Sequence, residues 1–524
     1  MSEAEPTIPK LPRLYRNYIS FVGGAIASAA LVSVVLLFLV EITAKRENPY
    51  LGIMTYIIFP SILILGLVII VIGMIWERRR RHRGSPSEIA AYPKLDLNDP
   101  RARHAFFVFL LVTFLFICAS AFGSYKAYEY SESDAFCGEA CHSVMKPEYV
   151  AYKAGAHARV GCVNCHVGPG AGWYVRSKLS GAYQLYSVTF KKYSRPITTP
   201  VHNLRPAPET CEQCHWPEKF FGAQLKVFNH YAYDEKNSLR QTRMLLNVGG
   251  GSPRTGIVAG IHWHMNIANV IDYISSDEQR QVIPWVRIQD KQGNVVEFYN
   301  RNKPLTQEQI AAAPKRRMDC VDCHNRPAHT YLPPDLAVDQ SFASGNLDPS
   351  LPFLKRESMV LLNKPYKTED EGIRTISSGI DQFYSQNYPD IHAKRSNDIK
   401  ASVTELQRIF RTYFFPEMRT NWQTHPNNIG HFYFSGCFRC HDGEHVSNTG
   451  KVIRNDCNIC HTVIYDSANP TASVQLGSYQ HPVDLGSLST RKCETCHKAN
   501  EPFRHPVNLG DISMFQCAEC HPKK

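Results

Sequence analysis

The sequence predicts a mainly α-helical and irregular protein, with three transmembrane helices at its N-terminus and a soluble part built around bound cofactors. Two observations lead to this fold class. Three long apolar segments fall within the first 127 of the 524 residues. Of the 17 cysteines, all but Cys118 lie in signatures of two cysteines followed directly by a histidine. Since this pattern attaches c-type haem, we expect a haem-cored multihaem cytochrome c.

Each apolar segment meets the length needed for a membrane span. The first, 18–40, carries no charge and is longer than the apolar core of a signal peptide. The second, 50–76, contains Pro60, which a spanning helix accommodates with a kink. The third runs from about 105 to 122. We therefore expect a multi-pass membrane protein.

Basic residues set the expected orientation. The loop after the second span begins with Arg78, Arg79, Arg80, Arg81 and Arg83, whereas the loop after the first span has few basic residues. The positive-inside rule places the arginine-rich loop and the N-terminal tail in the cytoplasm. Everything after the third span then lies in the periplasm of a bacterial inner membrane, the side on which haem is attached. A nucleic-acid patch is the alternative for the arginine run, but its position between two spans favours a topology signal.

Eight signatures account for the expected haems. The attaching cysteines are Cys137, Cys141, Cys162, Cys165, Cys211, Cys214, Cys320, Cys323, Cys437, Cys440, Cys457, Cys460, Cys493, Cys496, Cys517 and Cys520. The closing histidines, which we expect to bind iron, are His142, His166, His215, His324, His441, His461, His497 and His521. A zinc ribbon also uses paired cysteines, but it needs no histidine directly after the second one. We expect Cys118 to be a packing residue within its apolar helix.

The first signature differs from the others. Three residues separate Cys137 from Cys141, and Met145 follows His142 closely. A methionine thioether is a known axial ligand of haem iron. Either His142 or Met145 is therefore a candidate as the main protein ligand of the first haem.

The C-terminal part is an internal repeat, H-x4-G-x6-C-x2-C-H. His425, His445, His481 and His505 each stand upstream of one signature, and each is followed by a glycine five positions later. A haem that only relays electrons is expected to have both axial positions filled. We expect these four histidines to be sixth ligands, either of their own haem or of a neighbouring one.

Further sixth ligands must come from the other periplasmic histidines, for any of which an ordinary surface or hydrogen-bonding role is the alternative. If Met145 serves the first haem, three more ligands are needed from the spare histidines His157, His202, His230, His262, His264, His329, His392 and His431. Among these we select His230 and His264. In an extended chain His262 and His264 would point to the same side, so that both would face one haem and only one would bind it.

Three other segments complete the chain. The stretch 167–208 has basic residues but no Asp or Glu, and it suits either anionic lipid head groups or a quinol oxygen. A β-hairpin is expected from Val282–Gln289 and Val295–Tyr299 around a turn at 290–293. Residues 331–420 have no cysteine and a helical pattern around Asp398–Tyr413, so we expect a spacer or docking region.

The expected domains follow from these features. They are a cytoplasmic tail (1–17), two membrane helices (18–76), a basic cytoplasmic loop (77–104), a third membrane helix (105–127), a four-haem domain (128–330) with an insertion (216–319), the spacer (331–420) and a four-haem repeat domain (421–524).

Residues 105–330 resemble the NapC/NirT family of membrane-anchored quinol dehydrogenases. The likeness rests on a spanning helix, a first haem followed by Met145, HARVGCVNCH with His157, and CVDCHNRPAH with His329. It implies that His157 and His329 are sixth ligands and that the first haem receives electrons from menaquinol. Lys178 in VRSKLSG matches the lysine that family members place at the quinol. The family's carboxylate near the first haem has no counterpart in 167–208. The longer plan resembles inner-membrane cytochromes of metal-reducing bacteria, of the ImcH type.

These observations favour a quinol-oxidising cytochrome. It would take electrons from quinol at a site near the first haem that includes Lys178 and Met145, and pass them along eight haems to periplasmic c-type cytochromes. Its partners would be membrane lipid and the quinone pool, with no nucleic acid; a partner subunit or homo-oligomer is left open. One alternative is an octahaem terminal reductase acting on nitrite, hydroxylamine or tetrathionate, which needs an iron with an open position. A quinone reductase running in the reverse direction is another, because the direction depends on potentials.

Overall fold

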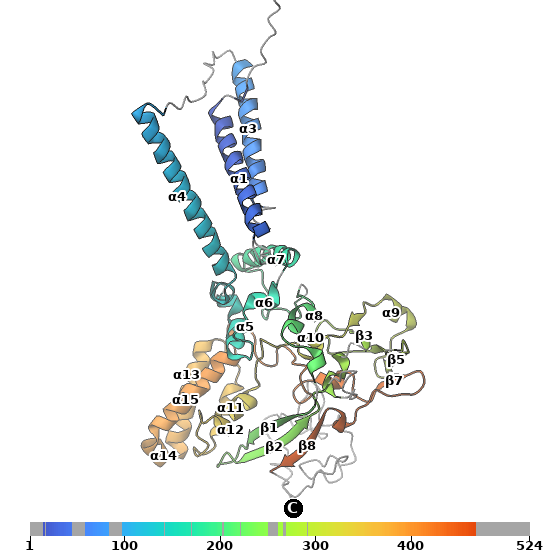
Figure 1. The fold of residues 1–524 in the computed structure, drawn as a ribbon. Coiled ribbons are helices and arrows are strands. Elements are labelled where there is room, and N and C mark those ends of the chain that lie inside the picture. The colour runs from blue at the N-terminus through green and yellow to red at the C-terminus, as the bar shows by residue number, and fades with distance from the viewer. Residues whose placement is uncertain are drawn as a thin grey trace, which may run out of the picture. The chain divides into compact units, whose positions relative to one another are not determined.

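The computed structural model describes residues 14–15, 17–43, 58–82, 97–140, 142–168, 170–201, 204–220, 222–249, 260–265, 269–290 and 292–467. The chain forms two compact units: Met1–Glu132 with Val167–Tyr183, and Ser133–His166 with Gln184–Lys524 (Figure 1). The last two signatures and the last two repeat histidines lie outside the described residues. They are Cys493, Cys496, His497, Cys517, Cys520, His521, His481 and His505.

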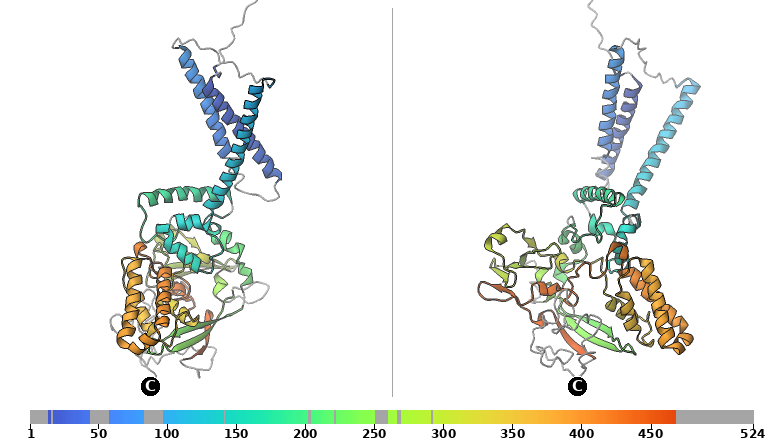
Figure 2. Two further views of the ribbon diagram at one scale, coloured as in Figure 1. Left: turned by 90° about the vertical axis from the view of Figure 1, so that its left-hand side faces the viewer. Right: turned by 180° about the vertical axis from the view of Figure 1, so that it is seen from behind.

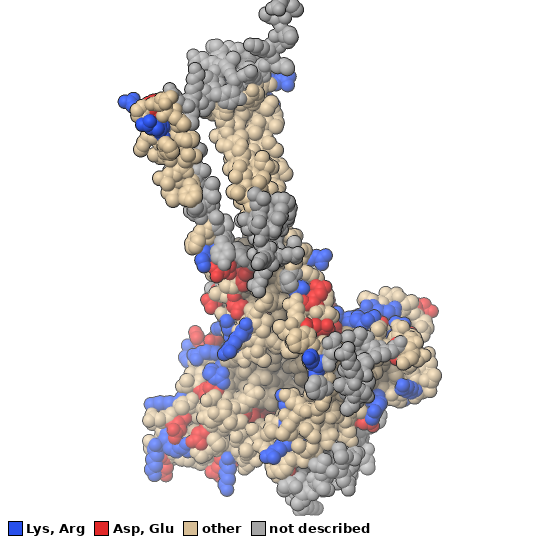
Figure 3. All heavy atoms as spheres, in the orientation of Figure 1, with Lys and Arg blue, Asp and Glu red and all other residues tan. Residues whose placement is uncertain are grey.

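The first unit is built from long helices. They are α1 (Tyr18–Thr43), α3 (Phe59–His82) and α4 (Pro100–Ser131). Within the described residues, Tyr18–Leu37 and Phe59–Arg80 are long and apolar enough to cross a membrane. The exposed surface of α1 and α3 carries almost no charged side chains along most of its length (Figure 3). The third predicted span, 105–122, falls within the 32-residue helix α4.

Helices α1 and α3 run alongside each other (Figure 2). They pack closely because small residues lie at their contact. A Cβ atom on Gly23 would lie 2.7 Å from the Gly66 carbonyl oxygen, and one on Gly66 would lie 2.7 Å from the Ala27 nitrogen. Asn17 donates to the Gly73 carbonyl (3.1 Å), so the start of α1 meets the end of α3 and the helices are antiparallel. Small residues and polar contacts of this kind are the usual means of helix association in lipid.

Two antiparallel sheets organise the middle of the second unit. One has the order β1-β2-β8 and the other β6-β3-β4-β5-β7. Their bounds are β1 Gln224–Tyr231, β2 Leu239–Leu246, β3 Val270–Ile274, β4 Trp285–Gln289, β5 Val295–Asn300, β6 Arg316–Arg317, β7 His445–Ser447 and β8 His461–Asp466. The predicted hairpin is confirmed as β4–β5, in which Trp285 pairs with Tyr299.

The sheets extend beyond that hairpin. Strands β7 and β8 come from the repeat region yet pair with β5 and β2, which belong to the predicted insertion 216–319. Sequence reasoning missed these pairings because edge strands of three to six residues carry little pattern of their own. The insertion and the start of the repeat region therefore form one structure.

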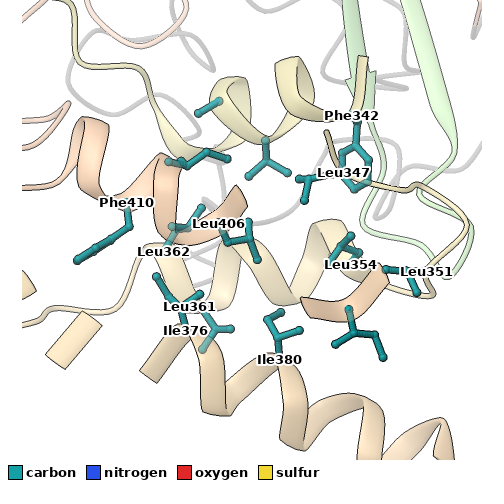
Figure 4. Packing of buried hydrophobic residues seen from close by; sticks show 14 of the residues in the cluster. Phe342, Leu347, Leu351, Leu354, Leu361, Leu362, Ile376, Ile380, Leu406 and Phe410 are labelled. Atoms are coloured by element: carbon teal, nitrogen blue, oxygen red, sulfur yellow. The ribbon is translucent and has the colours of Figure 1, made fainter. Parts of the chain in front are cut away.

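Residues 331–420 form a helical bundle. Its helices are α11 (Pro334–Ala343), α12 (Leu354–Leu362), α13 (Glu369–Asn387), α14 (Pro389–Lys394) and α15 (Ser396–Tyr413). Helix α15 confirms the helical pattern expected around Asp398–Tyr413. Figure 4 shows leucine and isoleucine side chains meeting between the helices, with Leu354, Ile376 and Leu406 fully buried. Here the core is made of aliphatic and aromatic side chains, in contrast to the haem core expected for the soluble part.

A buried ion pair connects this bundle to the first sheet. Lys355, only 1% exposed, donates to Asp339 Oδ1 at 2.6 Å. The same oxygen accepts from the Tyr231 backbone (3.0 Å), which lies at the end of β1. Asn237, just before β2, donates to the Leu351 carbonyl at 2.8 Å. The bundle is thus a fixed part of the second unit rather than a passive linker.

We predict that Gly66→Leu separates α1 from α3. The leucine would need the space of the Ala27 backbone, and overpacking of this kind costs about 1–3 kcal/mol. The measurement is oxidative cross-linking of Ser20→Cys with Ile70→Cys in membranes. These positions are chosen because Ser20 Oγ lies 3.2 Å from the Ile70 oxygen. The background carries Cys118→Ser, so that this cysteine forms no competing cross-link. Gly24→Leu is the matched control, since a Cβ there meets nothing within 4 Å. Equal cross-linking in both variants would contradict the prediction.

We also predict that Leu406→Ala loosens the bundle. Leu406 is fully buried, and truncating such a leucine costs about 2–5 kcal/mol. Hydrogen exchange followed by mass spectrometry should show faster exchange across α13 and α15, while β1–β5 keep wild-type rates. Exposed Lys400 on the same helix provides the control Lys400→Ala. Exchange that rises equally in the sheets would show that the bundle has no separate core.

Candidate haem-binding sites

Short helical turns present the cysteines of the described signatures. The second begins α6 (Cys162–His166), the third η3 (Cys211–Gln213) and the fourth α10 (Cys320–Cys323). The fifth and sixth lie on η7 (Gly436–Arg439) and η8 (Cys457–Ile459). Residues three apart on a helical turn lie on the same face, which is the placement that two thioether bonds to one haem need.

In the third, fourth and fifth signatures a backbone hydrogen bond joins the closing histidine to the same turn. The N–H groups of His215, His324 and His441 donate to the carbonyl of the first cysteine of their signature, at 2.8, 2.8 and 3.0 Å. The first signature has one more residue, and it lies on a wider π-helical turn, Phe136–Ala140, after which α5 (His142–Ala154) begins. Met145 is half-buried in the first turn of α5.

Asp134 fixes the first two signatures to each other. Its carboxylate accepts from the Cys162 backbone (2.9 Å) and from the Tyr152 hydroxyl (3.0 Å), and that hydroxyl in turn accepts from the Gly161 backbone (2.9 Å). Burial alone would raise the pKa of Asp134, but these hydrogen bonds outweigh it and lower the pKa. Asp134 stands three residues before Cys137, the start of the first signature. In its ionised form it thus anchors the start of the second signature close to the first.

Five closing histidines each face a second histidine. The pairs and their ring-centroid distances are His166–His329 at 6.2 Å, His215–His157 at 6.2 Å, His324–His262 at 6.2 Å, His441–His264 at 5.8 Å and His461–His431 at 6.0 Å. A metal ion bound between two imidazoles has bonds of about 2 Å on each side, which with the ring radii gives a centroid distance of roughly 6 Å. Each pair therefore has the spacing at which two histidines could hold one iron.

Hydrogen bonds orient these rings for metal binding. The Nδ1 atoms of His157, His262, His264, His329 and His441 contact the backbone carbonyls of Pro327 (3.0 Å), Val248 (2.7 Å), Ile261 (2.8 Å), Glu148 (2.9 Å) and Arg454 (2.5 Å). A carbonyl only accepts, so Nδ1 carries the proton and Nε2 of the neutral ring keeps its lone pair for a metal. Burial lowers the pKa of His264 to about 4 and lowers the pKa of His324, which favours the neutral form.

The paired histidines connect different signatures. His157 precedes the second signature but faces the closing histidine of the third. His329 follows the fourth signature but faces His166, the closing histidine of the second. His431 precedes the fifth signature but faces His461, the closing histidine of the sixth. The residues thus fit a row of haems in which each is held by chain segments that also belong to its neighbours.

Some of the histidines expected to be sixth ligands lie opposite a closing histidine in the structure, and others contact different residues. His157, His264 and His329 are in pairs. His230 instead has its Nδ1 atom 3.3 Å from Asp339, and His425 has its Nδ1 atom 3.1 Å from the Thr199 hydroxyl. The Nε2 atom of His425 is buried and has no hydrogen-bond partner, and burial lowers the pKa of this ring to about 4.

His445 lies away from the closing histidines. Its ring is fully buried in β7, where Nδ1 contacts Asp442 (2.9 Å) and Nε2 contacts the Ile283 carbonyl (2.8 Å). In this arrangement both nitrogens contact the protein. The two described copies of the repeat share a turn, since Gly430 and Gly450 both have positive φ (80° and 81°), which favours glycine.

Two paired histidines were not selected from the sequence. His262 was set aside because an extended segment would place it beside His264, but Ile261–Met265 is a 3₁₀ turn. With about three residues per turn, positions two apart differ by roughly 120° and face different neighbours. His431 was among the spare histidines, and no spacing signal distinguishes it.

Lys178 lies on α7 (Ala171–Thr189), in the part that belongs to the first unit. Its ammonium forms an ion pair with Glu132 and lies 3.4 Å from the Ser131 hydroxyl and 4.9 Å from the Tyr174 ring centroid. The other carboxylate oxygen of Glu132 is buried with no hydrogen-bond partner. Lys178 thus pairs with a carboxylate that lies before the first signature, outside 167–208.

Helix α7 also carries an exposed apolar face. Val175, Leu179, Tyr183 and Tyr186 recur at helical spacing, and Leu179 and Tyr183 are 69% and 68% exposed. Arg176 stacks on Trp173 at 5.1 Å. A helix with exposed apolar residues and basic side chains suits the interface between lipid and water.

Comparison with known proteins agrees with this arrangement. Residues 99–199 match the N-terminal region of the NapC/NirT cytochrome c family. The cytochrome c-type protein ImcH of Geobacter sulfurreducens is 42% identical over 496 residues, which cover 94% of this chain and 97% of that protein. No solved structure matches the chain significantly. The chain therefore belongs to the ImcH-like cytochromes of the NapC/NirT family, which are membrane-anchored electron-transfer proteins with covalently bound haem c.

Proposed function

We propose that this protein oxidises menaquinol at the inner membrane and passes the electrons along eight haems to a periplasmic c-type cytochrome. The observation that carries the proposal is the set of five histidine pairs, each spaced for one iron and each connected to a neighbouring signature. An iron bound by two histidines relays single electrons without a change of ligands.

Three spans give the topology for this function. Helix α4 would cross the membrane as the third, since 32 residues extend about 48 Å and the hydrocarbon core is about 30 Å thick. The arginines at the end of α3 would stay in the cytoplasm, and the signatures after α4 would lie in the periplasm.

The quinol site is proposed at Lys178 and Glu132. The Lys178 ammonium would donate to a quinol oxygen, and the unpartnered oxygen of Glu132 would accept a quinol proton as the electrons leave. Glu132 lies only five residues before Cys137, which keeps this step close to the first haem. The apolar face of α7 would offer the quinol a path from the lipid.

Met145 is proposed as a ligand of the first haem. It follows His142 in the first turn of α5, and a thioether ligand raises the potential of a haem relative to a second histidine. A higher potential at the first haem would favour acceptance of electrons from quinol.

The histidine pairs favour a relay over a terminal reductase. A reductase acting on nitrite or hydroxylamine needs an iron with an open position. In the part of the chain that the structure describes, each closing histidine from the second to the sixth signature faces another histidine, which fills that position.

We predict that Lys178→Ala slows reduction of the membrane-embedded protein by a menaquinol analogue at least tenfold. A hydrogen bond to a charged group contributes about 1.5–3 kcal/mol, which corresponds to one or two powers of ten in rate. Glu132→Gln should slow it by a similar factor, because an amide accepts no proton. Stopped-flow spectroscopy of haem reduction is the measurement.

The control for this experiment is Arg176→Ala, which removes another cation from α7 without touching Glu132. Dithionite should still reduce every variant completely, which shows that the haems remain intact. Wild-type rates in both Lys178→Ala and Glu132→Gln would remove these residues from the site.

We predict that the purified protein carries eight haems and that exogenous ligands reach at most one of them. Intact mass gives the number of haems. Cyanide, nitrite and hydroxylamine should leave the spectra of the haems held by histidine pairs unchanged, because both axial positions are filled. Fewer than eight haems, or ligand-dependent changes at several of them, would contradict the proposed relay.

A further inference from the structure

One 3₁₀ turn, Ile261–Met265, contacts two different signatures. His262 stacks with His324 of the fourth signature, with ring planes 5° apart and centroids at 6.2 Å. His264 meets His441 of the fifth signature, with ring planes 89° apart and centroids at 5.8 Å. The two histidines are separated by one residue only, yet each has its own partner.

The turn is held rigidly. Gly260 has a φ of +113°, and a Cβ there would lie 2.3 Å from the Gly249 oxygen, so the chain enters the turn through a position that requires glycine. The Ile261 backbone donates to Asn247 at 2.7 Å. Asn269 donates to the Trp263 carbonyl at 3.1 Å, and the Trp263 ring packs edge-on to His264 at 5.8 Å.

The fourth and fifth signatures are also bonded directly to each other. Arg439, which lies between the two cysteines of the fifth signature, donates to the backbone carbonyl of Asp322 at 2.6 Å. Asp322 lies between the two cysteines of the fourth signature, and its carbonyl also accepts from Asn428 at 3.0 Å. Two haems attached here would have little freedom to move apart.

We propose that this turn supplies the sixth ligands of two haems, His262 for the haem of Cys320 and Cys323 and His264 for the haem of Cys437 and Cys440. The turn then joins the last haem of the NapC/NirT-like part to the first haem of the C-terminal part as one fixed pair. The inference rests on the haem attachment in the proposed function but not on quinol oxidation. It assigns both histidines, where the sequence suggested that only one would bind iron.

The test replaces each histidine by alanine, singly and together, in the full-length protein. Each single variant should convert one haem from low spin to high spin, and the double variant should convert two, as counted by electron paramagnetic resonance of the oxidised protein. Added imidazole should restore the low-spin signals by filling the vacated positions. The signal lost in His262→Ala should be that of parallel rings, and the one lost in His264→Ala that of perpendicular rings.

Methionine variants keep the test informative if alanine variants fold poorly. His262→Met and His264→Met each retain a ligand and should each raise the potential of one haem in a spectroelectrochemical titration. His230→Ala is the matched control, because that ring contacts Asp339 instead of a closing histidine, and it should change no spin state.

Two results would overturn the inference. Single variants in which every haem stays low spin would show that neither histidine is required. A double variant with only one high-spin haem would show that both serve the same iron. A failure of the proposed quinol oxidation is distinguishable, since it would appear as slow reduction of the wild type by quinol while the spin-state counts still held.

Discussion

The hydrogen bond from a histidine Nδ1 to a backbone carbonyl is the interaction on which the site depends. It holds the ring of His157, His262, His264, His329 or His441 and leaves Nε2 free of the proton. The accepting carbonyls lie in different elements, for example Glu148 in helix α5 and Ile261 in the 3₁₀ turn. The fold therefore acts mainly as a frame for imidazole orientation, and potentials would be tuned through ligand type and burial.

The frame combines two kinds of core. Around the signatures, small apolar clusters such as the one that packs against Cys440 are joined by polar anchors, Asp134 and Arg439, that connect neighbouring turns. In residues 331–420, by contrast, leucines and isoleucines pack without any signature. Asp339, which pairs with Lys355 inside this bundle, also accepts a hydrogen bond from the Tyr231 backbone at the end of β1. This contact fastens the bundle to the sheet. Expecting haem to replace the core everywhere was wrong for this stretch, because its periodic apolar residues suffice to bury one another.

Local patterns were readable from the sequence, and contacts between distant segments were not. The signatures, the β4–β5 hairpin and helix α15 each follow from a few neighbouring residues. Partners such as His431 and His461 depend on how separate loops meet, which no spacing records. The separation of His262 from His264 could not be predicted, because side-chain direction depends on whether the segment is extended or 3₁₀. The contacts of His445 with Asp442 and Ile283 likewise depend on how distant segments meet.

The edge strands from the repeat region have a consequence for biogenesis. Arg240 of β2 pairs with Asp466 of β8, which is made 226 residues later, and β5 likewise waits for β7. A chain exported from its N-terminus would expose unpaired strand edges until those late segments cross the membrane. With the proposed topology, the early part of the chain would be exposed to aggregation and proteolysis until β7 and β8 have crossed the membrane, and faster secretion would then raise the yield.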